Sequence, residues 1–236
     1  MMATLYLIRH GQASFGSDNY DQLSELGQLQ ADLTGQFFRD IGVTFEMAFA
    51  GDLSRQRETG ERILAAQPQP CALHIDPRFN EINNEEQVKA LLPMLCAQND
   101  ALRAVVAQGL NNSKRYQKVI EAVFNAWVAP DCDASGIQPW PEFRDQVYEA
   151  VDQVMAVAGS GTTSAIFSSG GTIAALVARV VGASADGIYQ FYEPMMNCSI
   201  TQLFYSRSRV SLSCFNDVAH LQLLGAQRQA ALVTYR

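Results

Sequence analysis

The sequence predicts an α/β protein whose central sheet consists mostly of parallel strands. Short apolar runs of strand length alternate with longer segments in which apolar residues recur at helical spacing. The chain has 236 residues, 48% of them apolar and 17% charged, which suffices for one domain with a substantial core. We therefore expect residues 1–236 to form a single domain.

The first half of the chain supplies three expected strands. Residues 5–8 form a short apolar run, and Ser24 then caps a helix with apolar residues at helical spacing. Residues 47–50 predict a second strand, which Gly51 ends before a charged helix. Residues 73–75 are a weaker third strand. Strands separated by helices in this way favour parallel pairing.

The middle of the chain, from about residue 84 to 135, differs because it contains no strand-like run. Its segments are helical and amphipathic, for example at residues 116–128. A stretch rich in small and turn residues at 131–141 closes it. We expect a helical insertion that forms a lid.

The second half returns to the alternation of helices and strands. A helix with Pro141 near its first turn precedes a buried strand at 165–167. A glycine-rich turn then leads into an apolar helix at 172–181. Two late strands, compatible with a hairpin, are expected at 200–205 and 210–215.

The composition narrows the possible partners. The formal net charge is −7 and no block of Lys or Arg stands out, so nucleic acid is not an expected partner. No apolar run is long enough to span a membrane, and the first residues lack the basic start and apolar stretch of a signal peptide. These observations favour a cytoplasmic protein that does not bind membranes.

The cysteines and the short motifs indicate neither disulfides nor a bound cofactor. The cysteine count is odd, no two cysteines have CxxC spacing, and we expect reduced, buried thiols. The five are Cys71, Cys96, Cys132, Cys198 and Cys214. No metal-ligand spacing, P-loop or dinucleotide fingerprint occurs, so we expect no metal and no cofactor. The late strands could pair across a homodimer.

Three segments follow predicted strands and should meet at one edge of the sheet. They bring together Arg9, His10, Arg55 and a glycine-rich turn that opens a helix. Arginine forks and helix N-terminal N–H groups bind phosphate, and a neutral imidazole nitrogen can attack phosphorus. Gly11 would let the backbone approach a ligand closely. The pattern predicts phosphoryl chemistry.

Several motifs together resemble one family. LIRHGQ at 7–12 is similar to its signature, an apolar strand followed by Arg-His-Gly and Glu or Gln. LSELGQLQA at 23–31 and LSRQRET at 53–59 resemble the next two segments, with Gly51 where a serine usually stands. FNE at 79–81 resembles the segment with the acidic residue, and NDVAHL resembles the C-terminal motif. The chain is thus identified as resembling the histidine phosphatase superfamily, branch 1, which is phosphoglycerate mutase-like.

The resemblance implies a fold and a set of roles. The fold would be a three-layer α/β/α sandwich with a mostly parallel sheet and a helical insertion. His10 would be phosphorylated, and Arg9 and Arg55 would clamp the phosphoryl oxygens. Glu81 would give a proton to the leaving oxygen and later activate water. We prefer Glu81 over its neighbours Glu85 and Glu86 on motif position.

The implied function is a phosphomonoester hydrolase that uses a phosphohistidine and takes a small phosphomonoester as substrate. The glycine-rich turn would place Ser169 and Gly170 beside the phosphoryl group. Gln12 and His220 are accessory candidates. The natural substrate would be set by the lid, whose sequence does not identify it.

The pattern departs from the family at the glycine-rich turn, which reads SGGTI at 169–173. Ser169 stands where the resemblance implies a second histidine that touches the transferred phosphoryl group. Losing one strong transition-state donor costs about 2.7–4 kcal/mol, so activity could be reduced. We expect Ser169→His to raise turnover, and His220 is a candidate to enter the gap. Gly16 stands near an expected phosphate-binding Asn, for which Ser14 or Ser17 could compensate.

Other functions stay open on the sequence. Ser169, Asp217 and His220 occur in the order of a serine hydrolase, although Phe167 breaks its elbow motif. The chain could also be a phospho-ligand binding or regulatory module that has lost turnover with the second histidine. Mutase-type phosphotransfer is a further alternative within the family. Hydrolysis is the preferred prediction.

Overall fold

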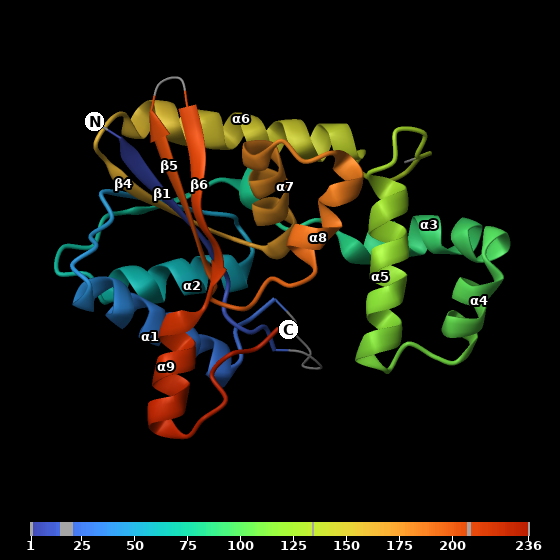
Figure 1. Ribbon diagram of the computed structural model, residues 1–236, viewed down its shortest axis with the longest axis horizontal. Coiled ribbons are helices and arrows are strands. Elements are labelled where there is room, and N and C mark those ends of the chain that lie inside the picture. The colour runs from blue at the N-terminus through green and yellow to red at the C-terminus, as the bar shows by residue number, and fades with distance from the viewer. Residues whose placement is uncertain (1, 15–20, 134, 207–208, 236) are drawn as a thin grey trace.

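A six-stranded sheet forms the centre of the computed structural model, which describes residues 2–14, 21–133, 135–206 and 209–235 (Figure 1). The order across the sheet is β3-β2-β4-β1-β5-β6. The strands are β1 (Ala3–Arg9), β2 (Met47–Ala50), β3 (Leu73–Ile75), β4 (Thr163–Ser168), β5 (Ile200–Ser206) and β6 (Arg209–Asp217). Each strand expected from the sequence is present.

The first four strands in the chain are parallel and the last two are not. β1 pairs in parallel with β4, and β2 pairs in parallel with both β4 and β3. β5 runs antiparallel to β1, and β6 antiparallel to β5. The two-residue gap between β5 and β6 permits only antiparallel pairing. The mostly parallel sheet is confirmed; residues 207 and 208, in the expected hairpin turn, lie outside the described residues.

Helices cover both faces of the sheet (Figure 1). Those of the described residues are α1 (Glu25–Asp40), α2 (Ser54–Ala65), α3 (Asn84–Gln98), α4 (Asp100–Ala107), α5 (Ser113–Trp127), α6 (Trp140–Ala158), α7 (Gly170–Val181), α8 (Tyr189–Tyr192) and α9 (Ala219–Arg228). Two 3₁₀ helices are η1 (Pro77–Phe79) and η2 (Ala185–Gly187). α1, α2 and α9 lie on one face, and α6 and α7 on the other, each with its own apolar core. The three-layer fold is confirmed.

The helix ends follow local chemistry. The Ser24 hydroxyl accepts a hydrogen bond from the Gly27 N–H (3.0 Å), which caps α1 as expected. Proline lies in the first turn of α6, where its missing N–H is harmless. α7 begins at Gly170, two residues before the predicted start, because both glycines join its first turn. It ends at Gly182, which adopts the left-handed conformation (φ 70°).

The expected helical insertion consists of α3, α4 and α5, which stand to one side of the sheet (Figure 1). α5 is anchored by Phe124 and Trp127, whose rings belong to the same core as α6. The Trp127 ring meets the Trp140 ring edge-on at 5.3 Å between centroids. Burial of these aromatic rings attaches the end of α5 to the core beside α6. Its function as a lid stays a proposal.

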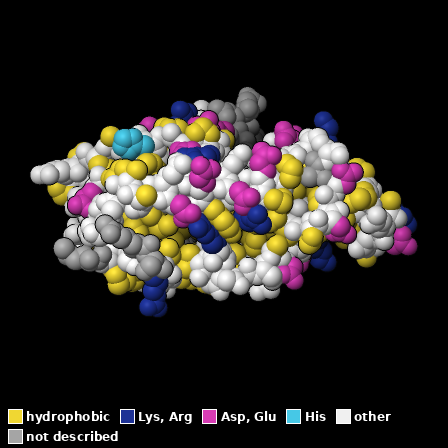
Figure 2. All heavy atoms as spheres, turned by 90° about the horizontal axis from the view of Figure 1, so that it is seen from above, with side chains coloured by type: hydrophobic (Ala, Val, Ile, Leu, Met, Phe, Trp, Pro, Cys, Tyr) yellow, Lys and Arg dark blue, Asp and Glu magenta, His cyan; other side chains and the backbone are white. Residues whose placement is uncertain are grey.

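The surface and the cysteines add two observations. The face over α6 carries charges of both signs between apolar side chains (Figure 2). Among the described residues, no helix has the length and apolar character needed to cross a bilayer. All five cysteines are free, but only Cys198 is buried; the other four are half-buried, so the expectation of buried thiols was wrong for those four.

Candidate active site

The three segments predicted to meet do so at the carboxyl ends of β1, β2 and β4. The His10 N–H donates to the Ser168 carbonyl (2.9 Å), and the Gly51 N–H donates to the Phe167 carbonyl (3.3 Å). Parallel pairing puts the residues that follow these strands side by side. His10, the start of α2 and the glycine-rich turn are therefore neighbours.

His10 is buried and held in one tautomer. Its Nδ1 lies 2.7 Å from the Gly11 carbonyl oxygen, which can only accept, so Nδ1 carries the proton. Its Nε2 accepts a hydrogen bond from the Arg55 Nε (3.2 Å). Burial, and then the nearby positive charges of Arg55 and Arg9, hold the pKa of His10 well below its ordinary 6.5. At neutral pH, Nε2 is therefore unprotonated, and its lone pair faces Arg55.

The loop that carries His10 is fixed against α1. A Cβ on Gly11 would lie 2.4 Å from the Gly27 carbonyl oxygen, so Gly11 permits close packing on a helix. The approach of Gly11 to a ligand stays a prediction. Gln12 belongs to the same contact. Its side-chain oxygen accepts from the Ser24 hydroxyl (2.9 Å), and its N–H donates to the Gln30 side chain (2.9 Å). Gln12 positions the loop.

Arg55 is oriented by a residue that the sequence did not indicate. Its guanidinium forms an ion pair with Asp21 (2.6 Å). The second Asp21 oxygen accepts the Ser54 N–H at the start of α2 (2.7 Å). A carboxylate at a helix N-terminus is favourable, and here it also leaves the Arg55 Nε directed at His10. A lone Asp in a loop gives no signal of this in the sequence.

Arg9 reaches the C-terminal tail. Its guanidinium donates to the carbonyl oxygens of Met195 and Tyr235, the second at 3.1 Å. It also lines the cavity that contains His10 and Arg55. Two always-charged groups therefore lie at the buried end of this cavity, where a phosphoryl group would need them.

Glu81 lies on the loop after η1 and faces the first turn of α7. Its carboxylate accepts hydrogen bonds from the N–H groups of Gly171 (2.9 Å) and Ile82 (3.0 Å). A Cβ at Gly171 would lie 2.5 Å from that carboxylate, so the glycine makes the contact possible. Burial raises the pKa of Glu81 above its ordinary 4.5, against the lowering effect of Arg55 and the two N–H groups. A carboxyl whose pKa is raised holds its proton to a higher pH, which suits a general acid.

The helix N-terminus expected to bind phosphate is therefore engaged by Glu81. Ser169 is also turned away: it is fully buried, and its hydroxyl accepts from the Gln56 amide (2.7 Å). That amide also donates to the Phe79 carbonyl (3.1 Å). Neither Ser169 nor Gly170 is among the described residues that line the cavity.

Gly51, Gln56 and Ser169 form one packed unit, which we call the Gln56 cluster. A Cβ on Gly51 would lie 1.9 Å from the Gln56 side-chain oxygen, so the missing side chain at 51 makes room for the amide at 56. That oxygen is buried and has no hydrogen-bond partner among the described residues. The signal in the sequence was that the resemblance implies a different residue at both Gly51 and Ser169.

His220 does not join the site. Its Nε2 lies 2.9 Å from the Thr34 hydroxyl, and its ring stacks on Phe37 at 4.9 Å between centroids. Burial lowers the pKa of His220 to about 4, so it is a neutral packing residue between α9 and α1. It lies apart from Ser169, so the serine-hydrolase order does not assemble a triad. Gly16 and Ser17 lie outside the described residues; the Ser14 N–H pairs with the Gln22 carbonyl.

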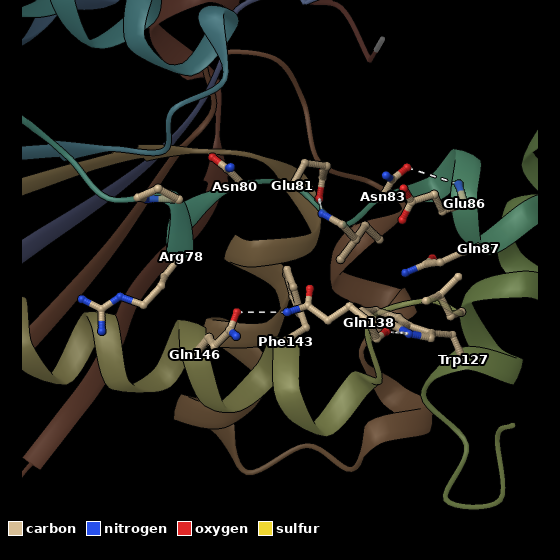
Figure 3. A pocket seen from close by; sticks show the side chains of 13 residues that line it. Arg78, Asn80, Glu81, Asn83, Glu86, Gln87, Trp127, Gln138, Phe143 and Gln146 are labelled. Carbon is tan, nitrogen blue, oxygen red and sulfur yellow. Dashed lines mark hydrogen bonds between the residues drawn. The ribbon is translucent and has the colours of Figure 1, made fainter. Parts of the chain in front are cut away.

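Two cavities meet at the loop of residues 80–83. The larger, of about 650 Å³, contains Arg9, His10 and Arg55 at its buried end. The smaller, of about 360 Å³, lies between this loop and α6 (Figure 3). Glu81 borders both, whereas Glu85 borders the larger and Glu86 the smaller. Of the three acidic neighbours, only Glu81 contacts the first turn of α7.

The sequence model of the histidine phosphatase superfamily (branch 1) matches residues 5–91 and 102–218. The chain belongs to this superfamily. The resemblance seen in the motifs is thereby confirmed. The position of Ser169 relative to the family's second histidine stays a prediction.

Similar proteins are known from sequence and from solved structures. A probable phosphoglycerate mutase (GpmB) of Erwinia tasmaniensis is 26% identical over 232 residues, 94% of this chain and 96% of that one. A phosphoserine phosphatase mutant of Entamoeba histolytica, solved with phosphoserine, gives a TM-score of 0.63 at 18% identity, over 93% and 99%. The phosphoglycerate mutase of Bacillus anthracis gives 0.63 at 17% identity, over 93% and 95%. At these identities the solved structures establish the fold.

Proposed function

We propose that the protein is a phosphomonoester hydrolase that forms a phosphohistidine on His10. The observation that carries this proposal is the imidazole geometry. Nε2 of His10 is unprotonated, faces Arg55 and lies in a cavity with Arg9 and Glu81. Nucleophile, phosphate-binding cations and proton donor are together in one buried place.

The first step transfers the phosphoryl group to the enzyme. Nε2 attacks phosphorus, the bond from phosphorus to the alcohol oxygen breaks, and the Glu81 proton passes to that oxygen. Arg9 and Arg55 hold the non-bridging oxygens and offset the charge that develops on them. The Gly11 carbonyl accepts from Nδ1 and stabilises the imidazole as it gains positive character.

The second step returns the enzyme to its starting state. Water attacks the phosphoryl group while the Glu81 carboxylate takes a proton from it, and the bond from Nε2 to phosphorus breaks. Orthophosphate leaves, His10 is again neutral, and Glu81 is again protonated. One residue thus serves as acid and then as base.

The test of this proposal is to trap the phosphoenzyme. The protein is mixed with a small phosphomonoester and quenched without acid, because phosphohistidine is acid-labile, and phosphate is located by peptide mass mapping. The chain has three histidines, so the site is unambiguous. We expect phosphate on His10 with release of the alcohol, and no label in His10→Ala. Phosphate on His74 or His220 alone would reject the mechanism.

The pH profile is a second prediction. With an alkyl phosphate such as glycerol 1-phosphate, whose leaving oxygen needs a proton, kcat/KM should fall at low pH as His10 takes up a proton, with that limb below 6.5 because its pKa is lowered. It should also fall at high pH as Glu81 loses its proton, with that limb above 4.5 because its pKa is raised. In Glu81→Gln the alkaline limb should vanish and the acid limb should remain. Because both proteins are assayed on the same substrate, the ionisation of the substrate affects both profiles equally. An alkaline limb that is unchanged in Glu81→Gln would show that Glu81 does not cause it.

A second candidate function is favoured by the Gln56 cluster. Because Ser169 is turned away from the cavity, the site lacks one donor to the phosphoryl group, and a phospho-ligand binding module would need no such donor. Binding of vanadate without hydrolysis of any ester would favour that function over hydrolysis. Mutase-type transfer remains a third outcome, visible as movement of phosphate between substrate hydroxyls.

A further inference from the structure

We propose that the larger cavity selects phosphomonoesters whose alcohol carries a positive charge, such as an ammonium group, and disfavours alcohols that carry a carboxylate. The inference rests on the proposed function, since it concerns the part of the substrate that leaves. It follows from the charges, the hydrogen bonds and the aromatic side chains of the cavity wall.

The charges of the wall are unevenly distributed. Among the described residues that line the cavity, the only Lys or Arg residues are Arg9 and Arg55. Both lie beside His10, where the oxygens of a bound phosphoryl group would pair with their charges. At the exposed end the charged residues are Glu85 and Glu193. A substrate bound through its phosphate therefore directs its alcohol toward two carboxylates.

Glu193 is held in place across the mouth. The Gln117 amide on α5 donates to the Glu193 carboxylate (2.5 Å) and to the Tyr235 hydroxyl (2.9 Å). This links the insertion, the end of α8 and the C-terminal tail. The Gln117 amide carries no charge, so its hydrogen bond orients the Glu193 carboxylate without neutralising it. The negative charge is therefore held at a fixed place in the mouth of the cavity.

Four tyrosines complete the wall between the two ends. Tyr116, Tyr189, Tyr192 and Tyr235 all line the cavity. Burial, and then the charge of Glu81, raises the pKa of Tyr192, so its ring keeps its phenol proton. Tyrosine rings attract organic cations, and carboxylates beside them strengthen that preference. Rings with two nearby carboxylates favour an ammonium group over a neutral polyol.

The same wall is unsuited to an acid. A carboxylate on the alcohol would meet Glu85 and Glu193 with no further described Lys or Arg in the lining to pair with it. Like charges in contact repel, and the tyrosine faces are themselves electron-rich. The cavity should therefore bind 3-phosphoglycerate poorly, although similar sequences include a probable phosphoglycerate mutase.

The test compares three phosphomonoesters that differ in the charge of the alcohol. Phosphoethanolamine is cationic, glycerol 1-phosphate is neutral, and 3-phosphoglycerate is anionic. We expect kcat/KM to fall in that order, by about fivefold for each carboxylate contact, the size of one charge–charge contact in water. Affinities of the same esters for His10→Ala, measured by calorimetry, should fall in the same order.

Variants decide whether the carboxylates cause the order. Glu85→Gln with Glu193→Gln should bring phosphoethanolamine and 3-phosphoglycerate to within about twofold of each other. Glu86→Gln, an exposed neighbour that borders the other cavity, should leave the order unchanged. Arg236 lies outside the described residues; Arg236→Gln should not reverse the order.

The two readouts separate this inference from the proposed function. Equal or stronger binding and turnover of 3-phosphoglycerate relative to phosphoethanolamine would overturn the charge selection. An order that survives in Glu85→Gln with Glu193→Gln would overturn the role of these carboxylates. The expected order in binding to His10→Ala, with no ester hydrolysed by the wild type, would support the selection and reject the hydrolase.

Discussion

Glu81→Gln should slow hydrolysis of an alkyl phosphate by about 10²–10⁴-fold, the range for loss of a general acid or base. Hydrolysis of 4-nitrophenyl phosphate should fall by about tenfold or less in a single-turnover phosphorylation assay. Nitrophenolate leaves without protonation, whereas an alkoxide needs a proton, which we propose that Glu81, its pKa raised by burial, supplies. Glutamine retains the shape and can still accept the Gly171 N–H through its carbonyl oxygen.

The difference between the two leaving groups is the decisive measurement for Glu81. A loss of equal size on both esters would mean that Glu81 positions α7 or the phosphoryl group and does not give up a proton. Glu86→Gln is the matched control. Glu86 is an exposed acidic residue five positions further along the chain, and of the two cavities it borders only the smaller one. This variant should react with both esters at wild-type rates.

Ser169→His alone should give no gain in turnover, whereas Ser169→His combined with Gln56→Ala should raise it by about 100- to 1,000-fold, the value of one strong transition-state donor. The single substitution was expected from the sequence to suffice. Ser169 is fully buried, however, with the Gln56 amide 2.7 Å from its hydroxyl. An imidazole at 169 would therefore overlap the amide.

Removal of the Gln56 amide leaves few hydrogen-bonding groups without a partner. The Phe79 carbonyl loses one donor but keeps the Ser168 hydroxyl (2.6 Å). The side-chain oxygen of Gln56 is buried without a hydrogen-bond partner among the described residues, so its removal breaks no hydrogen bond. The space that Gln56→Ala opens is next to position 169. This position directly follows β4, whose last residue, Ser168, pairs with Arg9 at the end of β1.

Four proteins form the comparison: wild type, each single variant and the double variant, assayed on 4-nitrophenyl phosphate with the melting temperature recorded for each. Gln56→Ala alone should be no faster than wild type, and Ser169→His alone should lower the melting temperature. A non-additive gain in the double variant would show that the Gln56 cluster suppresses activity. A folded double variant with wild-type turnover would show that position 169 cannot reach the phosphoryl group.

Much of the fold could be predicted from the sequence because its signals are local. The strand at 47–50 needed only an apolar run ended by Gly51, and the cap of α1 needed only Ser24 before a helical pattern. The motif around His10 also indicated the family, since it combines a strand end, an arginine and a histidine within six residues. Such features depend on neighbours in the chain.

Local patterns in the chain predicted the alternation of strands and helices, the family and the residues proposed to react. The tertiary structure alone decided how the remaining polar groups are used. Gln56 and Ser169 pair although they are 113 residues apart, and His220 packs on Thr34 instead of entering the site. A hydrogen bond between distant segments depends on how the sheet brings those segments together and on the space that a missing side chain leaves, as at Gly51. Neither can be inferred from the residues that are neighbours in the chain.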